Sequence, residues 1–351
     1  MQGSVIDRVG LALACAGRPG SRRVLAESGG VVALPPGWEE AARAEIQRAA
    51  RMGAAILTPG DAGFPPLLCD AADPPPVLFA LGAPATEDRL AIAVVGARRA
   101  THWGASFAFR LARDLAAAGF TVTSGLARGI DAAAHRGALA AGGRTLAVLG
   151  HGIEHDIYPP EHRTLARQIA EHGALISQFP PSLPPLSYHF PARNRTLAGL
   201  ALGVVVVEAA ERSGSLITAG FAGDLGREVF AVPGRITSAA SRGSNGLIRD
   251  GARLVGHWTD IVSELPEPWR SAVAVAAMTP MQAPWAPGSD EARMLELLTA
   301  DEPQHIERLI ARAGVDAARA GATLIGLELA GHARQLAGQR WVAIVARARR
   351  A

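Results

Sequence analysis

The sequence predicts an α/β fold: a doubly wound, Rossmann-like parallel sheet, with a small helical N-terminal domain and a C-terminal winged-helix-like domain. One observation predicts the sheet and a second predicts its boundaries along the chain. Short apolar runs recur through residues 89–265, and helical patterns separate most of them. Prolines that gather within residues 59–82 and again within 266–287 separate this stretch from the segments on either side.

The apolar runs are the predicted strands of the sheet. They are continuous rather than alternating, which is typical of parallel strands that are buried on both faces. The six predicted strands are Leu90–Val95, Phe120–Thr123, Thr145–Leu149, Ala174–Ser177, Gly203–Val207 and Glu228–Val232. Two of the helices between them are predicted at Ser106–Ala118 and Asp131–Ala141.

The predicted domain boundaries follow these changes in composition. Four segments are expected: a small helical domain resembling SAM or helix-hairpin-helix modules at 1–58, the Rossmann-like domain at 59–266, a proline-rich linker at 267–288 and the winged-helix-like domain at 289–351. In the last segment, three helices are predicted at Glu291–Thr299, Pro303–Arg312 and Asp316–Ala330, followed by a hairpin over His332–Val345 that turns at Gly338.

Arginine supplies all the basic side chains except histidine, because the 35 lysine and arginine positions include no lysine. A Walker A lysine and a Schiff-base lysine are therefore excluded. The two cysteines, Cys15 and Cys69, are too few for a disulfide framework or a zinc ribbon. The sequence shows neither an apolar run of bilayer length nor a secretory signal, so we expect a cytoplasmic protein that does not engage a membrane.

The residues that follow the predicted strands share one chemical character. Glycines, hydroxyl groups and arginines dominate these loops, and glycine with exposed backbone N–H groups suits the close approach of an anion. Residues 89–260 contain 18 arginines against 12 carboxylates, a net charge of +6, whereas the whole chain carries +3. Since ligands of such sheets bind beyond the carboxyl ends of the strands, we expect a site for several successive phosphates of a nucleic-acid strand. The alternative is that these residues are helix caps and solvated surface.

Other kinds of site fit less well. Ser124-Gly125 stands where a nicotinamide-binding sheet needs an acidic residue. His151-Gly152-Ile153-Glu154-His155 has the spacing of a zinc motif, but its glycine and the prolines that follow disfavour the helix such a motif requires. Asp131 is expected to cap the helix that it begins. We therefore expect no catalytic residue, no metal and no cofactor.

Five phrases in this order resemble the DNA-processing protein A (DprA/Smf) family, and the resemblance runs from about Pro59 to Leu265. The phrases are Val94-Val95-Gly96-Ala97-Arg98-Arg99-Ala100-Thr101, Ser124-Gly125-Leu126-Ala127-Arg128-Gly129-Ile130-Asp131, Arg193-Asn194-Arg195, Ser213-Gly214-Ser215-Leu216-Ile217-Thr218-Ala219 and Val232-Pro233-Gly234. The resemblance implies a non-enzymatic protein that binds and protects single-stranded DNA, forms a homodimer, and loads the RecA recombinase in natural transformation.

The resemblance also implies which residues bind the strand. They are Arg98, Arg99, Ser124, Gly125, Ala127, Arg128, Gly129, Arg193, Asn194, Arg195, Ser213, Gly214 and Ser215. The chain departs from the family in having arginine or a neutral residue where lysine is common. The candidates for base stacking are His151, Tyr158, Tyr188 and Phe190.

Two other functions remain open at this point. A nucleotide or nucleoside-phosphate hydrolase needs an acid beside a phosphate loop, and Glu208 with Ser213–Ser215 offers that combination. A duplex-DNA-binding regulator would act through Asp316–Ala330 as its recognition helix. That helix carries one arginine, Arg319, and two carboxylates, Asp316 and Glu328, so its net charge is −1. A negative charge is unfavourable for binding in a DNA groove. We therefore favour a structural or partner-docking role for the tail.

Overall fold

The computed structural model describes residues 4–15, 34–267, 269–272, 288–299, 302–329 and 332–343. The chain folds as two compact units, Met1–Ala276 and Ala277–Ala351. The finer division at residues 58, 266 and 288 stays a prediction, and most of the expected linker lies outside the described residues.

A nine-stranded sheet forms the centre of the first unit, in the order β1-β2-β6-β5-β4-β3-β7-β8-β9. Strands β3 to β9 are mutually parallel, while β2 pairs antiparallel with both β1 and β6. The strands are β1 (Ala55–Leu57), β2 (Leu78–Gly82), β3 (Ala91–Val95), β4 (Thr121–Ser124), β5 (Thr145–Val148), β6 (Ala174–Ser177), β7 (Gly203–Val206), β8 (Glu228–Ala231) and β9 (Arg253–Leu254).

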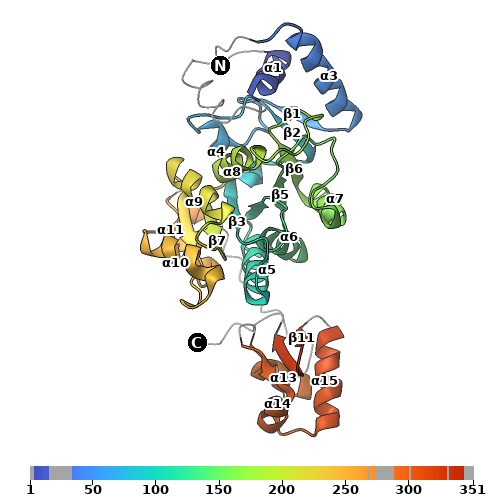
Figure 1. Ribbon diagram of the computed structural model, residues 1–351, viewed down its shortest axis with the longest axis vertical. Helices are drawn as coiled ribbons and strands as arrows, with labels where there is room; N and C mark the ends of the chain where they lie inside the picture. The colour runs from blue at the N-terminus through green and yellow to red at the C-terminus, as the bar shows by residue number, and fades with distance from the viewer. Residues whose placement is uncertain are drawn as a thin grey trace. The chain divides into compact units, whose positions relative to one another are not determined.

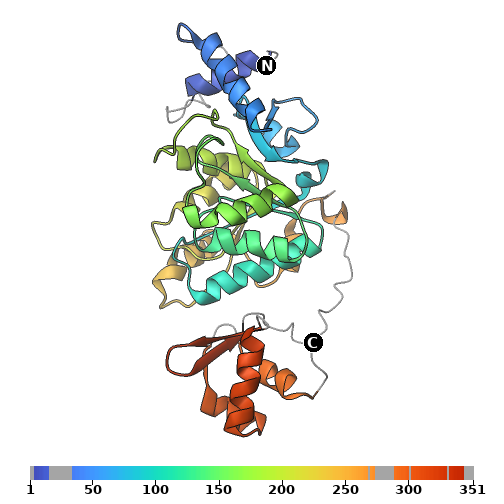
Figure 2. The ribbon, with the colours of Figure 1, turned by 90° about the vertical axis from the view of Figure 1, so that its right-hand side faces the viewer.

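Helices connect these strands and cover both faces of the sheet (Figure 1). The α-helices of this unit are α1 (Val5–Cys15), α3 (Trp38–Arg51), α4 (Pro66–Cys69), α5 (His102–Ala117), α6 (Ile130–Ala140), α7 (Arg163–His172), α8 (His189–Gly199), α9 (Gly214–Asp224), α10 (Arg242–Arg249), α11 (Trp258–Glu264) and α12 (Trp269–Ala272). Short 3-10 helices occur at η1 (Thr86–Leu90), η2 (Pro160–His162) and η3 (Ala239–Ser241). Helices α5, α6 and α7 lie side by side over one face (Figure 2).

The side chains of β3 show why the sheet is covered twice. Ile92 and Val94 pack with α5, α6 and α11, whereas Ala93 and Val95 pack with α8 and α9 on the opposite face. All five residues of β3 are buried. The predicted doubly wound α/β fold is confirmed, and its continuous apolar strands are explained by burial on both faces.

The six predicted strands agree with β3 to β8 to within a residue or two at each end. The sequence reasoning missed β1, β2 and β9. Strand β2 follows three consecutive prolines, Pro74–Pro76, which indicated irregular chain. Helix α5 begins four residues before the predicted Ser106, because the Thr101 hydroxyl caps it by accepting from the Gly104 N–H at 3.0 Å.

The chain reverses its direction of travel across the sheet between β3 and β7. It builds β4, β5 and β6 on one side of β3 and then returns to place β7 on the other side. In open α/β sheets, the crevice beyond the carboxyl ends of the strands at such a point is where ligands bind. We call this side of the sheet, with the loops that follow β3, β4, β5, β6, β7 and β8, the carboxyl edge.

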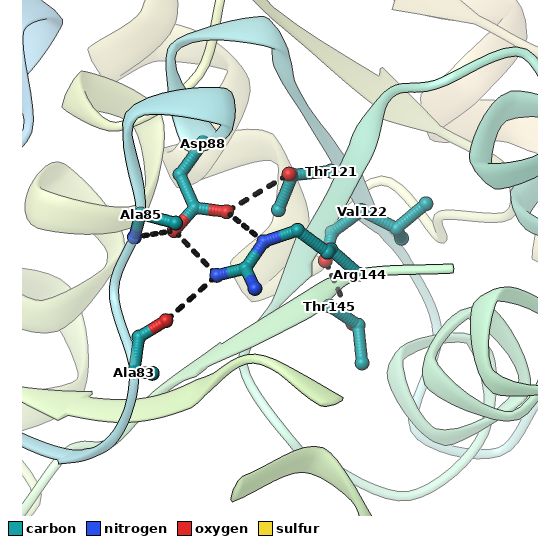
Figure 3. Close-up of polar contacts among 7 residues, drawn as sticks. All are labelled: Ala83, Ala85, Asp88, Thr121, Val122, Arg144 and Thr145. Carbon is teal, nitrogen blue, oxygen red and sulfur yellow. Dashed lines mark hydrogen bonds and ion pairs between the residues drawn. The ribbon is translucent and has the colours of Figure 1, made fainter. Parts of the chain in front are cut away.

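On the opposite side of the sheet, which we call the amino edge, Asp88 and Arg144 form an ion pair (Figure 3). The Asp88 carboxylate accepts two hydrogen bonds from the Arg144 guanidinium, each 2.9 Å, and one from the Thr121 hydroxyl, also 2.9 Å. Arg144 also donates to the Ala83 carbonyl oxygen at 2.8 Å. Asp88 is 6% exposed. Because it bonds to Thr121 in β4 and to Arg144 just before β5, it connects the starts of these strands to the segment that precedes β3.

Helix α3 attaches the N-terminal part of the chain to this unit. The buried Glu45 carboxylate accepts from the Ser182 backbone N–H at 2.9 Å and from its hydroxyl at 2.6 Å. Arg48 donates to Glu154 at 2.8 Å. Both partners lie in the loops after β6 and β5, so α3 braces loops of the carboxyl edge.

The described residues of the second unit form three helices and a small antiparallel sheet of order β10-β12-β11. Its elements are α13 (Asp290–Leu297), β10 (Gln304–His305), α14 (Ile306–Ala313), α15 (Ala317–Leu329), β11 (Ala333–Leu336) and β12 (Arg340–Ala343). Met294, Leu309, Leu324 and Trp341 are among its buried core residues. The predicted helix start at Pro303 is wrong, because Gln304 pairs with Trp341 in the sheet and the helix begins at Ile306.

Candidate nucleic-acid interface

An aromatic ring lies close to two guanidinium groups at the carboxyl edge. The guanidinium carbon of Arg98, from the loop after β3, lies 5.5 Å from the centre of the Phe190 ring, and that of Arg193 lies 5.8 Å from it. Phe190 stands in the first turn of α8 and is half-buried. These separations are those of cation–π contacts. We call Arg98, Phe190 and Arg193 the arginine–phenylalanine cluster.

Arg193 is the buried member of this cluster, at 5% exposed. Its guanidinium donates to the Gly125 carbonyl oxygen at 2.8 Å and to the Val148 carbonyl oxygen at 2.6 Å. Burial lowers the pKa of Arg193 to about 10, although the nearby Asp131 carboxylate acts in the opposite direction. Arg193 therefore ties the ends of β4 and β5 to α8 and fixes the position of Phe190.

Asp131 organises the loop that follows β4. Its carboxylate accepts from the backbone N–H groups of Gly125 at 3.1 Å and of Ala127 at 3.3 Å. Burial raises the pKa of Asp131, and Arg193 opposes that shift. The prediction that Asp131 caps its own helix is wrong: Gly129 occupies the cap position, and the Asp131 side chain turns back to the preceding loop.

The loops after β3 and β4 are packed directly against each other. Gly129 has φ 76°, and a Cβ atom there would lie 2.2 Å from the Ala97 carbonyl oxygen. That carbonyl accepts from the Ile130 N–H at 3.2 Å. Ser124 is fully buried, and its hydroxyl donates to the Val94 carbonyl oxygen at 2.7 Å. The structure thus gives Ser124, Gly125 and Gly129 internal contacts that shape the loops.

Glu208, the acid considered for a hydrolase, is engaged within the protein. Its carboxylate accepts from the Thr101 hydroxyl at 2.5 Å and from the Thr101 backbone N–H at 2.9 Å. It is 2% exposed and lies so close to α5 that a Cβ atom on Gly104 would be 2.3 Å from its carboxyl carbon. A carboxylate in this place stabilises the N-terminus of α5.

Arg98 and Arg99 are exposed, and neither forms an ion pair with a carboxylate among the residues that the structure describes. Arg128 differs from them although it is also exposed. It donates to Glu161 at 2.5 Å, and this contact lowers the pKa of Glu161 to about 2. The positive charge of Arg128 is therefore compensated within the protein, while those of Arg98 and Arg99 are available to a ligand.

The start of α9 lies at the same edge, after β7. Ser213 caps this helix by accepting from the Ser215 N–H at 3.3 Å, and the hydroxyls of Ser213 and Ser215 are 2.7 Å apart. Gly214 is exposed, and no atom of the described chain beyond its immediate neighbours lies within 4 Å of a Cβ built there. The Asn194 amide is 3.5 Å from the Gly214 carbonyl oxygen, so α8 and α9 meet at this point.

Arg195 points to another part of the molecule. Its guanidinium binds the Asp73 carboxylate through contacts of 2.7, 2.8 and 3.0 Å and lies 5.4 Å from the centre of the Phe221 ring. Asp73 was not recognised from the sequence, because nothing in its position relative to Arg195 indicates that the two residues meet.

The structure thus places the predicted residues at three kinds of position. Arg98, Arg99, Gly214 and Arg128 are exposed at the carboxyl edge, while Ala127, Gly129, Asn194 and Ser213 are partly exposed there. Ser124, Gly125, Arg193 and Ser215 are buried beneath them. Arg195 belongs to a separate ion pair. Whether each residue contacts a ligand stays a prediction.

The histidines of the zinc-like motif lie in a loop. The Nδ1 atom of His151 is 2.9 Å from the Gly152 carbonyl oxygen, and Nε2 of His155 is 2.7 Å from the Ser182 carbonyl oxygen. Within the described ranges, no group of three or more His, Cys, Asp or Glu side chains is arranged to hold a metal ion. Nor does any helix in them have the length and apolar character needed to cross a bilayer.

The fold and this edge define a doubly wound α/β protein with exposed arginines at the topological switch point of its sheet. Residues 55–266 match the family model for DNA recombination-mediator protein A, and residues 278–339 match that for the DprA winged helix domain. The chain belongs to the DNA recombination-mediator protein A family. The winged-helix-like fold predicted for the tail is confirmed by the second match.

Two curated relatives illustrate the similarity. Protein Smf of Escherichia coli is 46% identical over 211 residues, which are 60% of this chain and 56% of the relative. DNA processing protein DprA of Bacillus subtilis is 43% identical over 196 residues, 56% of this chain and 66% of the relative. The chain thus spans between half and two thirds of the length of the curated relatives it matches.

Two solved structures are also similar. The X-ray structure of DNA processing protein A from Streptococcus pneumoniae is 32% identical, with a TM-score of 0.63, over 76% of this chain and 99% of that one. DNA processing protein A from Helicobacter pylori, described for its single-stranded DNA binding mode, is 28% identical, with a TM-score of 0.52, over 60% of this chain and 94% of that one.

Proposed function

We propose that this chain is a non-enzymatic DNA-processing protein that binds single-stranded DNA at the carboxyl edge of its sheet. The observation that carries the proposal is the arginine–phenylalanine cluster. A half-buried ring close to two guanidinium groups offers a stacking surface for a base and positive charge for the adjoining phosphate.

The phosphates would be bound by the two kinds of donor that surround this ring. Arg98 and Arg99 bring guanidinium groups without a carboxylate partner in the described chain, and the exposed start of α9 brings backbone N–H groups. Arg193, which is buried, would hold the Phe190 ring and the loop after β4 in position for the strand. These contacts would involve the phosphate backbone and one face of a base, both of which are similar for all four bases. We therefore expect binding to a single strand with weak sequence preference.

The finer biological role is proposed as well. The relative in Helicobacter pylori is described as binding single-stranded DNA, and the family description is that of a recombination mediator. These names support protection of an incoming strand and its transfer to a RecA-type recombinase in natural transformation. The resemblance of the five sequence phrases also supports a homodimer.

The hydrolase alternative is less well supported by the geometry. A general base needs a free carboxylate within reach of a water molecule. Glu208 is held by Thr101, and Asp131 is held by two loop N–H groups, so the two acids considered for this role already have structural partners.

The duplex-binding alternative meets a similar difficulty in the second unit. Arg319 of α15 binds Asp290, and the Glu328 carboxylate accepts from the Gln335 N–H at 2.9 Å. These charged groups brace the unit itself, which leaves α15 poorly equipped to read a major groove.

The test is a fluorescence-anisotropy titration of a labelled oligo-dT strand with the full chain and with an Arg98→Ala/Arg99→Ala variant. Loss of two charge-assisted phosphate contacts is expected to weaken binding by about 100-fold and to lessen the salt slope by about 1.4. The matched control, Arg89→Ala/Arg167→Ala, removes two exposed arginines elsewhere in the same unit and should retain the affinity to within about twofold. Equal losses in the two variants would overturn the proposed site.

A further inference from the structure

The loop between β8 and α10 presents an isolated apolar side chain to solvent. Ile236 is 88% exposed, the largest exposed fraction among the big hydrophobic side chains that the structure describes. It follows Pro233-Gly234-Arg235 directly after the carboxyl end of β8, and Pro233 and Arg235 are exposed as well. A single solvated isoleucine is common on protein surfaces, but this one follows the exposed Arg235 in a hydrogen-bonded turn.

The loop forms several internal hydrogen bonds despite its exposure. The Asn245 side chain accepts from the Gly234 N–H and donates to the Gly234 carbonyl oxygen, both at 3.0 Å. A Cβ atom on Gly234 would lie 2.1 Å from the Ser241 hydroxyl, so only glycine fits there. The Ser238 N–H donates to the Arg235 carbonyl oxygen at 2.9 Å, which closes a β-turn with Ile236 at its tip.

This turn stands in line with the proposed strand-binding site. In the sheet, β8 is two strands from β3 and four from β5, so the turn lies roughly 10–20 Å from the arginine–phenylalanine cluster along the carboxyl edge. Arg212, at the end of the intervening β7 loop, and Arg235 are both exposed and form no ion pair within the described part of the chain. The positive edge therefore continues to the turn, and this charge is complementary to a phosphate backbone.

We propose that the Arg235–Ser238 turn is a second contact site for the single strand, in which Ile236 packs against or between bases while Arg235 binds the neighbouring phosphate. Isoleucine is among the apolar side chains that proteins insert between stacked bases. The backbone of this turn is hydrogen-bonded, and Asn245 holds the preceding Gly234, which lowers the cost of ordering the loop when the strand binds. The inference rests on the proposed function, because it extends the same strand along the same edge.

The length of the strand separates the two sites. Oligo-dT of about 4 nucleotides should reach only the arginine–phenylalanine cluster, whereas about 20 nucleotides should reach both sites. With Ile236→Ser in the full chain, we expect about fivefold weaker binding of the long strand, from the loss of one apolar contact, and unchanged binding of the short strand. Ile236→Leu should restore the affinity for the long strand. Ile325→Ser, which alters an isoleucine of the second unit that is 54% exposed, is the matched control and should bind both strands like the unaltered chain.

The outcomes distinguish this inference from the proposed function. If the unaltered chain binds neither strand, the proposed function fails and the second site fails with it. If it binds both strands and Ile236→Ser binds the long one equally well, the second site alone is overturned. If Ile236→Ser instead shifts the mass measured by light scattering without changing strand affinity, Ile236 contacts a second copy of the chain and the inference is likewise overturned.

Discussion

The two edges of the central sheet both carry arginine, but they use it differently. At the amino edge, Arg144 is matched by the buried Asp88 and by a backbone carbonyl. At the carboxyl edge, Arg98 faces the Phe190 ring and Arg193 binds only backbone carbonyls and a neighbouring amide, with Asp131 turned to the loop N–H groups. Arg98 and Arg99 at the carboxyl edge thus lack, within the described chain, the carboxylate partner that Arg144 has at the amino edge.

This difference teaches that a count of arginines does not locate a binding site. Arg128, Arg144 and Arg195 are all compensated by carboxylates, and each stabilises a local arrangement of the chain. The binding role is better assigned to those guanidinium groups that the fold leaves without such a partner. The comparison predicts that changes at the amino edge alter stability, whereas changes at the carboxyl edge alter affinity.

The largest expected effect is a loss of stability at acidic pH, and its source is His135 at the amino edge of the sheet. His135 is fully buried, with its Nδ1 atom 2.7 Å from the Thr145 hydroxyl, and burial lowers its pKa from 6.5 to about 3. Below pH 6.5 the unfolded chain therefore binds a proton that the folded chain does not. The free energy of unfolding should fall by up to about 1.4 kcal/mol per pH unit from this group as the pH drops from 6.5 towards 3.

Urea unfolding between pH 7 and pH 4 measures this effect. His135→Asn, which retains a donor near Nδ1, should show a shallower dependence than the unaltered chain. His172→Asn, at an exposed histidine of α7, should keep the full dependence. Parallel curves for His135→Asn and the unaltered chain would contradict the assignment.

The next effect concerns the Asp88–Arg144 pair. Asp88→Asn leaves a partly buried guanidinium and the Thr121 hydroxyl poorly matched, so the free energy of unfolding should fall by about 2 kcal/mol. Strand affinity should stay within about twofold, because the pair lies at the other edge. Urea unfolding and anisotropy check the two statements. Asp250→Asn, whose exposed pair with Arg249 contributes little, is the control; a large loss of affinity in Asp88→Asn would break the division between the edges.

A smaller effect is expected at the ring of the cluster. Phe190→Ala should weaken oligo-dT binding by about tenfold, since stacking of a base on an aromatic side chain contributes roughly 1–3 kcal/mol. Phe190→Tyr retains the ring and should bind nearly as well as the unaltered chain. Anisotropy titrations at one fixed salt concentration compare the three proteins. Similar affinities in all of them would remove Phe190 from the site.

The smallest expected effect on strand affinity comes from removing the Glu161 carboxylate that binds Arg128. Glu161→Gln removes the carboxylate that compensates it, so affinity for oligo-dT should rise about twofold at low salt and return to the original value at high salt. Glu171→Gln, at an exposed position on α7, should give a smaller rise. Titrations at two salt concentrations test this. An increase that persists at high salt would show that the effect is not one of screened charge.

Much of the fold was predictable because it depends on apolar pattern. Strands β3 to β8 are continuous apolar runs, and the sequence places each of them to within a residue or two. Strand β2 escaped prediction because it follows Pro74–Pro76, which indicated irregular chain. Strand β9 has only two residues, Arg253 and Leu254, and both are exposed. Strand β9 therefore offers no local apolar pattern.

The location of the candidate site was predictable, but the state of its side chains was not. The rule for strand ends brings Arg98, Ser124 and Arg193 to one edge. It does not reveal that Ser124 is turned inward to Val94, or that Arg195 meets Asp73 across 122 residues of sequence. Such partners depend on tertiary packing, and no local spacing encodes them.

The central claim is that the uncompensated carboxyl edge binds a single strand. The most direct measurement is an anisotropy titration of the unaltered chain with labelled oligo-dT at several salt concentrations, with matched duplex as competitor. The account predicts an affinity that falls steeply with salt, by about 0.7 logarithmic units per tenfold rise in salt for each phosphate neutralised, and resists the duplex. Absence of binding, or equal competition by duplex, would contradict it.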